Sequence, residues 1–169
     1  MQHPSEPALY AALNRLGLPH RTEEHEAVFT VEEGRDVKAR LPGGHSKNLF
    51  LKDKAGEFVL ISALGDTPIR LNSLHPHIGC KRLSFGKPDK LDELLGVKPG
   101  SVTVFGVLND RKHKVRLILD RALWEHEYVW FHPMRNTAST RMRPDDILAF
   151  VRDTGHEPTV LDLRGLAGG

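Results

Sequence analysis

The stretch GGHSKNLFLKD, residues 43–53, joins a glycine-rich turn to an apolar strand and marks where the sheet begins. Side chains of a strand alternate between its two faces, so Lys47 shares a face with Leu49 and Leu51. An ammonium group on the more apolar face has two interpretations. Either its stem covers the core while its head reaches water, or it projects into a pocket and holds a polar ligand.

The rest of the chain predicts a mixture of helices and strands. Apolar residues three or four apart, an early proline and a following glycine predict helices at residues 7–16, 30–41, 87–95 and 143–154. β-Branched and alternating segments predict strands at residues 48–53, 57–64, 81–86, 114–120, 127–132, 137–142 and 158–163.

Three segments are less regular. Residues 68–71 predict a strand, followed by a short helix that is capped by Asn72 and interrupted by Pro76. Residues 98–108 begin with a Pro-Gly turn and continue into a β-branched segment. Residues 164–169 are expected to fray.

The order of these elements predicts the fold class. Strands outnumber helices and do not alternate with them regularly. This favours an α+β fold, a mixed sheet surrounded by helices, over a doubly wound parallel fold. The length of 169 residues suits one core. No repeat or linker marks a boundary, so a single domain spanning residues 1–169 is expected.

The composition is that of an ordinary globular protein, with 39% hydrophobic and 27% charged residues. No segment approaches the roughly 18 consecutive apolar residues of a membrane span, and the first residues do not resemble a secretion signal. A single cysteine, Cys80, excludes an internal disulfide and a cysteine-built zinc site. We therefore expect a cytoplasmic protein without a membrane partner.

The charge distribution leaves nucleic-acid binding open. A net charge of +2 is too mild to indicate such binding by itself. Two basic runs are stronger, although each is also typical of solvated loops and strand ends. The first holds Arg111, Lys112, His113, Lys114 and Arg116, and the second holds Arg135, Arg141 and Arg143.

Common catalytic motifs are missing from the sequence. Ten histidines raise the question of a metal, but none lies in a His-Glu-x-x-His motif or beside a carboxylate at a ligand spacing. No metal and no cofactor are expected. The chain has no Gly-x-Ser-x-Gly elbow and no glycine-rich phosphate loop. Cys80 is typical of a small buried hydrophobe rather than a nucleophile.

Four segments, in order along the chain, carry a resemblance to a known family. They are GGHSKNLFLKDKAGEFVL, KPGSVTVFGVLND, VWFHPMRNTASTRM and FVRDTGHEPTVLDL. Together they resemble the YbaK-type aminoacyl-tRNA editing family, related to the insertion domain of bacterial prolyl-tRNA synthetases. Within it, the sequence is most similar to free-standing alanyl-tRNA(Pro) deacylases, over nearly the whole chain.

The resemblance implies a mixed α/β fold around a partly closed sheet, no metal, and hydrolysis of a mischarged aminoacyl ester. The strand lysine of the family matches Lys47, and the asparagine after it matches Asn48. The histidine of the family's Phe-His-Pro motif matches His132, with Asn136 and Thr137 following.

The family also has a Gly-x-x-x-Pro loop that presents backbone amides to the substrate. This loop matches Gly100, Ser101, Val102 and Thr103. Val104 stands where the family has proline, so the loop is expected to lose some rigidity.

The implied reaction is attack of water on the ester, with a ribose hydroxyl of the substrate positioning or activating the water. Lys47 would orient the substrate, loop amides would stabilise the oxyanion, and His132 would either line the pocket or pack at a strand end. A pocket that admits alanine and excludes proline by size would supply selectivity. Its candidate walls, equally typical of any core, are Val28, Phe29, Leu49 and Phe105. The implied partners are the acceptor end of mischarged tRNA and prolyl-tRNA synthetase.

Three alternatives stay open. The substrate could be Cys-tRNA(Pro) or a tRNA carrying another small residue such as serine. The protein could be a non-catalytic accessory that docks on a synthetase. It could also be a non-catalytic module that holds tRNA or DNA through Arg111, Lys112, Lys114, Arg141 and Arg143.

Overall fold

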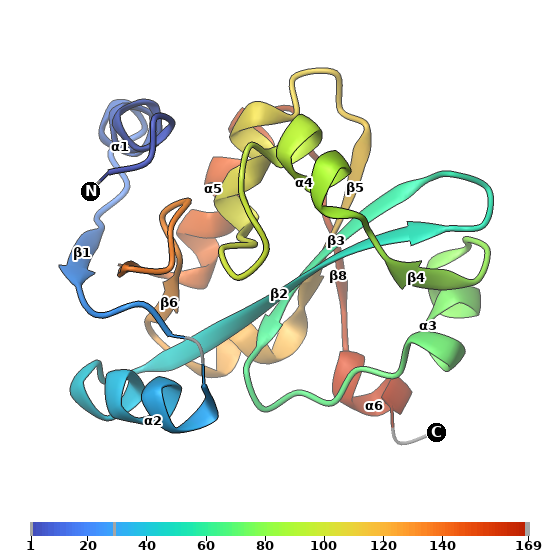
Figure 1. Cartoon of the computed structure of the whole chain (residues 1–169), viewed down its shortest axis with the longest axis horizontal. Helices are drawn as coiled ribbons and strands as arrows, with labels where there is room; N and C mark the ends of the chain where they lie inside the picture. Colours follow the sequence, from blue (N-terminus) through green and yellow to red (C-terminus); the bar gives the residue numbers. More distant parts are fainter. Residues whose placement is uncertain (1, 29, 168–169) are drawn as a thin grey trace.

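The computed structural model describes residues 2–28 and 30–167, and Figure 1 shows a mixed sheet with helices packed around it. The strands are β1 (Arg21–Glu24), β2 (Gly44–Asp53), β3 (Phe58–Leu64), β4 (Leu83–Phe85), β5 (Val115–Asp120), β6 (Val129–Phe131), β7 (Ala138–Met142) and β8 (Thr159–Leu161). The helices are α1 (Glu6–Arg15), α2 (Val31–Arg40), α3 (Leu71–Ile78), α4 (Pro88–Leu95), α5 (Pro144–Asp153) and α6 (Leu163–Ala167). Two 3-10 helices are η1 (Val104–Asn109) and η2 (Arg121–Glu125).

The sheet combines parallel and antiparallel pairs. Its strand order is β1-β7-β6-β2-β3-β5-β8, and β4 pairs with β2 outside this path. β2 and β3, which cover the strands predicted at residues 48–53 and 57–64, form an antiparallel hairpin, whereas β2–β6, β3–β5 and β5–β8 are parallel. The predicted α+β class with a mixed sheet is confirmed.

One edge of β2 opens in the middle. β3 pairs along the other edge from Ser46 to Lys52. On the open edge, β6 pairs with Gly44 and His45, and β4 pairs with the last three residues of the strand. Within the described part of the chain, residues 46–50 therefore have a neighbouring strand on one side alone. This gap positions the candidate site.

The two faces of β2 pack into different parts of the core. Phe50 belongs to the larger cluster, with Phe105, Phe131 and Phe150, beside α1, α4 and α5. Leu51 belongs to a smaller cluster with residues of α3 and α6. The predicted alternation along residues 47–52 is thus confirmed, and Lys47 lies on the face of the smaller cluster.

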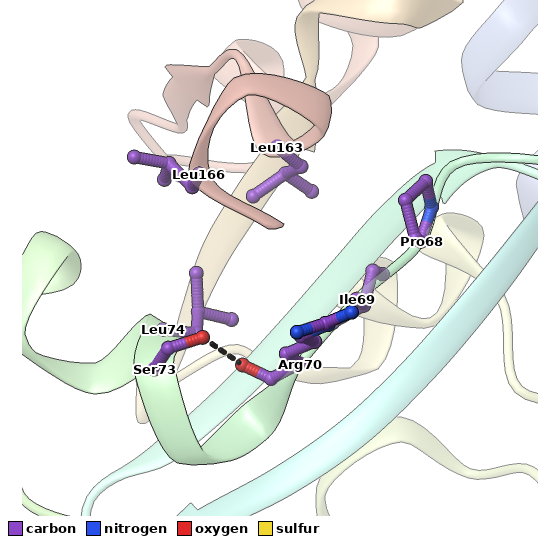
Figure 2. Close-up of a pocket in the computed structure, with 7 residues that line it drawn as sticks. All are labelled: Pro68, Ile69, Arg70, Ser73, Leu74, Leu163 and Leu166. Atoms are coloured by element: carbon purple, nitrogen blue, oxygen red, sulfur yellow. Dashed lines mark hydrogen bonds between the residues drawn. The ribbon is translucent and has the colours of Figure 1, made fainter. Parts of the chain in front are cut away.

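The small core cluster is closed by α6. Figure 2 shows Leu163 and Leu166 of α6 above Leu74 of α3 and the preceding Ile69. The hollow between them measures about 10 Å³, which is room for about one water molecule. It is too small to receive a substrate.

Helix ends follow the sequence, while several weaker segments do not. Thr30, the first residue of the helix predicted at 30–41, caps α2 by accepting a hydrogen bond from the Glu33 amide at 3.1 Å. The β-branched segment after Gly100 forms η1 rather than a strand, because its apolar side chains pack into the core around Phe105. The predicted strand at residues 68–71 is absent from the described structure, and α3 begins there instead.

The tail and two short elements also differ from prediction. Residues 164–167 do not fray, since Leu163 and Leu166 anchor α6 on the small core cluster; residues 168–169 lie outside the described residues. β1 and η2 were not predicted. The sequence of β1, RTEE, has no apolar alternation, and its ladder with β7 supplies the pairing. No helix among the described residues has the length and hydropathy to cross a bilayer.

Candidate functional site

A hollow of about 260 Å³ lies at the open edge of β2; we call it the strand-edge cavity. Two other parts of the chain face this edge, the loop before η1 and the end of β6. Its lining residues are Ser46, Lys47, Asn48, Gly100, Val102 and His132. The structure thus brings together five residues that the sequence singled out from three separate motifs.

The Lys47 ammonium is tethered inside the site rather than extended into solvent. It is half-buried, and its Nζ donates a hydrogen bond to the carbonyl oxygen of Thr67. Partial burial lowers the pKa of Lys47; the charges of Asp120 and Asp66 oppose this shift, and that of Lys38 adds to it. Two of the three ammonium hydrogens remain for other acceptors.

A buried carboxylate supports this arrangement. Asp120 is fully buried and accepts hydrogen bonds from the Thr67 hydroxyl at 2.6 Å, the Leu64 amide at 3.1 Å and the Ala122 amide at 3.1 Å. Asp120 therefore fixes the turn whose carbonyl holds Lys47.

Asn48 links the strand to the facing loop. Its Oδ1 accepts a hydrogen bond from the Val104 amide at 3.1 Å, and its Nδ2 donates to Ser46 Oγ at 3.2 Å. The Ser46 hydroxyl in turn donates to the Trp130 carbonyl at 2.9 Å. Because proline has no N–H, the family's residue at position 104 could not make the first of these bonds.

The loop offers fewer amides than the resemblance implies. The Ser101 amide donates to the Lys98 carbonyl at 3.0 Å within the turn, so it is not available to a ligand. Among the described residues, no protein acceptor contacts the amides of Gly100, Val102 and Thr103. Gly100 has φ +88°, a backbone conformation that favours glycine. Gly100 and Val102 line the cavity, whereas Thr103 is buried and caps η1.

His132 presents a neutral ring to the cavity. Its Nδ1 lies 3.1 Å from the Ala138 carbonyl, which can only accept, so Nδ1 carries the proton and Nε2 is an acceptor. Burial lowers the pKa of His132; the Ala138 bond opposes this shift and the charge of His25 adds to it. The imidazole is therefore uncharged near neutral pH.

A smaller hollow of about 100 Å³ adjoins the first under α2; we call it the side pocket. It shares Ser46 and His132 with the strand-edge cavity, and the expected wall Val28 lies in it. The remaining lining residues are His25, Gly34, Val37, Lys38, His45, Trp130, Phe131 and Ser139.

Other predicted residues lie outside the two hollows. Phe105 is fully buried in the core against Phe131 and Phe150, so the expectation that it forms a pocket wall is wrong. Leu49 packs on the small core cluster. Phe29 lies outside the described residues.

Two residues of the 132–137 segment support the site from its rim. Asn136 Nδ2 lies 3.7 Å from where a Cβ on Gly100 would be, so it flanks the loop. Thr137 accepts a hydrogen bond from the Arg135 guanidinium at 3.0 Å, and its carbonyl accepts from the His25 amide at 3.0 Å.

Sequence reasoning missed three contributors. Ser46 lies within the stretch 43–53 but was not singled out there, His25 carries no motif, and Asp120 ends a predicted strand without any local mark. A pattern could have found Ser46, because it shares a face of β2 with Asn48. Among the described residues, no three His, Cys, Asp or Glu side chains gather in a group that could hold a metal ion.

These features define a mixed α/β domain with a ligand-sized cavity built from hydrogen-bond donors and a neutral imidazole. The chain belongs to the aminoacyl-tRNA editing domain family, whose profile matches residues 25–150.

Individual proteins are similar to this chain over almost its full length. The chain is 40% identical over 161 residues to prolyl-tRNA synthetase associated domain-containing protein 1 of Bos taurus, covering 92% of this chain and 94% of that protein. It is 32% identical over 157 residues to the prolyl-tRNA editing protein ProX of Acetoanaerobium sticklandii, covering 92% and 96%. A crystal structure of a candidate trans-editing enzyme for prolyl tRNA synthetase shares the fold, with a TM-score of 0.73, 24% identity and coverage of 96% and 98%.

Proposed function

We propose that the whole chain forms one deacylase domain that removes alanine from mischarged tRNA(Pro) by metal-independent ester hydrolysis. The observation that carries this proposal is the strand-edge cavity, where the Lys47 ammonium and the loop residues Gly100 and Val102 face one space. An editing function of the ProX relative and the family profile support it.

The reaction joins water to the ester carbonyl carbon. The ester bond to the ribose oxygen then breaks, that oxygen takes a proton, and the products are free alanine and tRNA with a free terminal hydroxyl. Charge develops on the carbonyl oxygen in the transition state. The amides of Gly100 and Val102, which no described protein group occupies, are suited to stabilise it, at about 3–4 kcal/mol for a well-placed donor.

Lys47 binds the substrate rather than attacking it. Its ammonium is held by Thr67. Burial lowers the pKa of Lys47, and the charges of Asp120 and Asp66 oppose that shift in favour of the charged form. A charged ammonium has no lone pair for nucleophilic attack, but it binds a phosphate or ester oxygen well. The free Nε2 of His132 accepts a hydrogen bond from the ribose hydroxyl or from the attacking water, which helps to place it.

The side pocket accommodates the amino-acid side chain. Its lining residues Val37, Trp130 and Phe131 suit a methyl group. A synthetase site for proline cannot strongly reject a smaller residue, because one methylene changes binding by about 1–3 kcal/mol. A separate hydrolytic site that only small side chains enter removes the amino acid that the synthetase site wrongly admits.

A serine-specific activity is the second candidate. Ser139 Oγ and His25 Nε2 are 2.9 Å apart in the side pocket and could bond a substrate hydroxyl. We place alanine first because most of the remaining lining is apolar. A cysteine substrate would occupy the same pocket.

Deacylation assays test the proposal. Wild type and Lys47→Ala are compared on Ala-, Cys-, Ser- and Pro-tRNA(Pro) without added metal, with Lys52→Ala as the control on the same strand. We expect wild type to hydrolyse Ala-tRNA(Pro) fastest and to spare Pro-tRNA(Pro). Preference for cysteine or serine would replace the alanine assignment, and no turnover of any substrate would overturn the enzymatic function.

A further inference from the structure

We propose that Lys98, Arg111, Lys112 and Lys114 form a basic track that binds the phosphates of the RNA strand whose 3′ end enters the strand-edge cavity. This inference rests on the proposed function, because it assigns the surface that holds the same substrate.

The track centres on the loop between η1 and β5. Arg111, Lys112 and Lys114 are exposed and line a hollow of about 240 Å³. Among the described residues, none of the three forms an ion pair within 4.0 Å. Glu93 also lines this hollow, but Lys90 neutralises it at 2.9 Å. Asp110 lines the hollow too, but its carboxylate is buried and contacts His156. The three cations outnumber these two acidic residues, so the hollow carries excess positive charge.

The backbone of this loop is firmly held. Asp110 is buried; its carboxylate accepts a hydrogen bond from the Lys114 amide at 3.0 Å and contacts His156 Nε2 at 2.9 Å. His113 adopts φ +54°, which is uncommon outside glycine, and its Nε2 lies 2.9 Å from the Thr154 carbonyl. The three cations thus project from a fixed frame, which lowers the ordering cost of binding a ligand.

A further hollow lies between this loop and the candidate active site. It measures about 440 Å³, and its lining includes Gly96, Lys98 and Ser101. Its other charged residues are Asp92 and Arg135, and Arg135 is paired with Glu6 and Glu24. On one side, Asn109 of the basic hollow lies against Gly96, with Nδ2 2.7 Å from where a Cβ would be. On the other side, Ser101 stands between Gly100 and Val102 of the strand-edge cavity.

The dimensions suit an RNA strand. η1 separates the two loops and has six residues, a length of about 12 Å at the 3-10 rise. That length spans roughly three to four nucleotides at about 3.4 Å each.

The second basic run does not offer a comparable surface. Arg141 lies over the Tyr128 ring at 4.1 Å, and Arg143 lies over the same ring and pairs with Glu127 at 3.3 Å. These guanidinium groups are already engaged by protein side chains. The structure therefore favours the 111–114 loop over this run.

The test compares a triple variant, Arg111→Gln, Lys112→Gln and Lys114→Gln, with a matched control, Lys54→Gln, Lys81→Gln and Arg82→Gln. The control removes the same charge from exposed residues that line none of the three hollows. Binding of uncharged tRNA(Pro) and of its acceptor-stem hairpin is measured by fluorescence anisotropy from 50 to 200 mM KCl. Thermal unfolding checks that all three proteins are folded.

We expect the triple variant to bind the RNA about tenfold more weakly than wild type. The slope of the logarithm of the binding constant against the logarithm of the KCl concentration should fall in magnitude by about 2 to 3. The control should match wild type. Hydrolysis of a short substrate, the aminoacylated CCA trinucleotide, should be unchanged in the triple variant, whereas KM for full tRNA should rise. Equal binding by triple variant and wild type, or equal weakening in the control, would overturn the track.

The binding arm uses RNA without an amino acid, so it does not depend on turnover. A wild type that hydrolyses nothing but binds RNA through these residues would disprove the enzyme and retain the track. Binding of an acidic protein through the loop, with RNA affinity unaffected by the triple variant, would overturn the assignment to RNA.

Discussion

Asn48 and Val104 are joined by a hydrogen bond from the Val104 amide to the Asn48 side-chain oxygen, at 3.1 Å. This bond ties the open edge of β2 to the first residue of η1. Valine makes it possible, since proline at position 104 would have no N–H. The loop thus gains an attachment in place of the ring that the family's proline provides.

Replacing Val104 by proline should be tolerated by the fold. The first position of a helix accepts proline, because its amide has no partner within the helix. Losing the bond to Asn48 should lower the free energy of unfolding by about 1 kcal/mol. Val107→Pro, within η1, serves as the control and should cost about 3 kcal/mol or more. Denaturant unfolding measures both, and equal losses would contradict this account of position 104.

Lys47→Ala should abolish most activity without unfolding the protein. Lys47 is half-buried beside Thr67, and its removal takes away the cation proposed to orient the substrate, so kcat/KM should fall about 100-fold. Lys52 is exposed on the same strand, and Lys52→Ala should retain wild-type kcat/KM. Thermal unfolding of both variants tests the fold. A fully active Lys47→Ala would remove the residue from the mechanism.

Stability should decrease as the pH falls from 7 to 5. Burial lowers the pKa of both His45 and His132 in the folded protein. A histidine in the unfolded chain has a pKa of about 6.5, so below that pH the unfolded chain binds more protons than the folded one. The stabilisation is complete above that pH and is lost below it, by at most about 1.4 kcal/mol per pH unit for each histidine.

The contribution of one histidine can be isolated. The pH dependence of the unfolding free energy should be shallower in His45→Gln, whereas His77→Gln, at an exposed position of α3, should keep the wild-type slope. Urea unfolding at several pH values gives the slopes. The same slope for His45→Gln and wild type would refute the assignment.

Arg135→Met should destabilise the protein strongly. The Arg135 side chain is 9% exposed and binds Glu6, which is fully buried, at 2.6 Å, as well as Glu24 at 2.6 Å. Removing one partner of a buried pair leaves a buried charge and costs about 3–5 kcal/mol. Arg152→Met breaks the exposed pair with Glu157 and should cost less than about 1 kcal/mol.

A second variant tests the reason. If the unpaired Glu6 carboxylate causes the loss, then Arg135→Met combined with Glu6→Gln should recover part of the unfolding free energy. Denaturant unfolding of the single and double variants decides this point. No recovery would indicate that the lost packing of Arg135, rather than the stranded charge, dominates.

The sequence by itself determined features that depend on neighbouring residues. The cap of α2 by Thr30, the hairpin of β2 and β3 and the side of β2 that carries Lys47 all follow from local spacing. The resemblance to the editing family was also available from the motifs, and it named five of the six residues that line the strand-edge cavity.

The tertiary structure alone decided where the cavity opens and what supports it. β6 and β4 pair with the two ends of one β2 edge, and no local pattern shows that residues 46–50 between them have no strand on that side. The same holds for Phe105, which core packing places away from the site, and for Asp120, which reaches Thr67 from another strand. Local spacing fixes short-range hydrogen bonds and side-chain faces, whereas a cavity depends on how distant segments share the space that packing leaves between them.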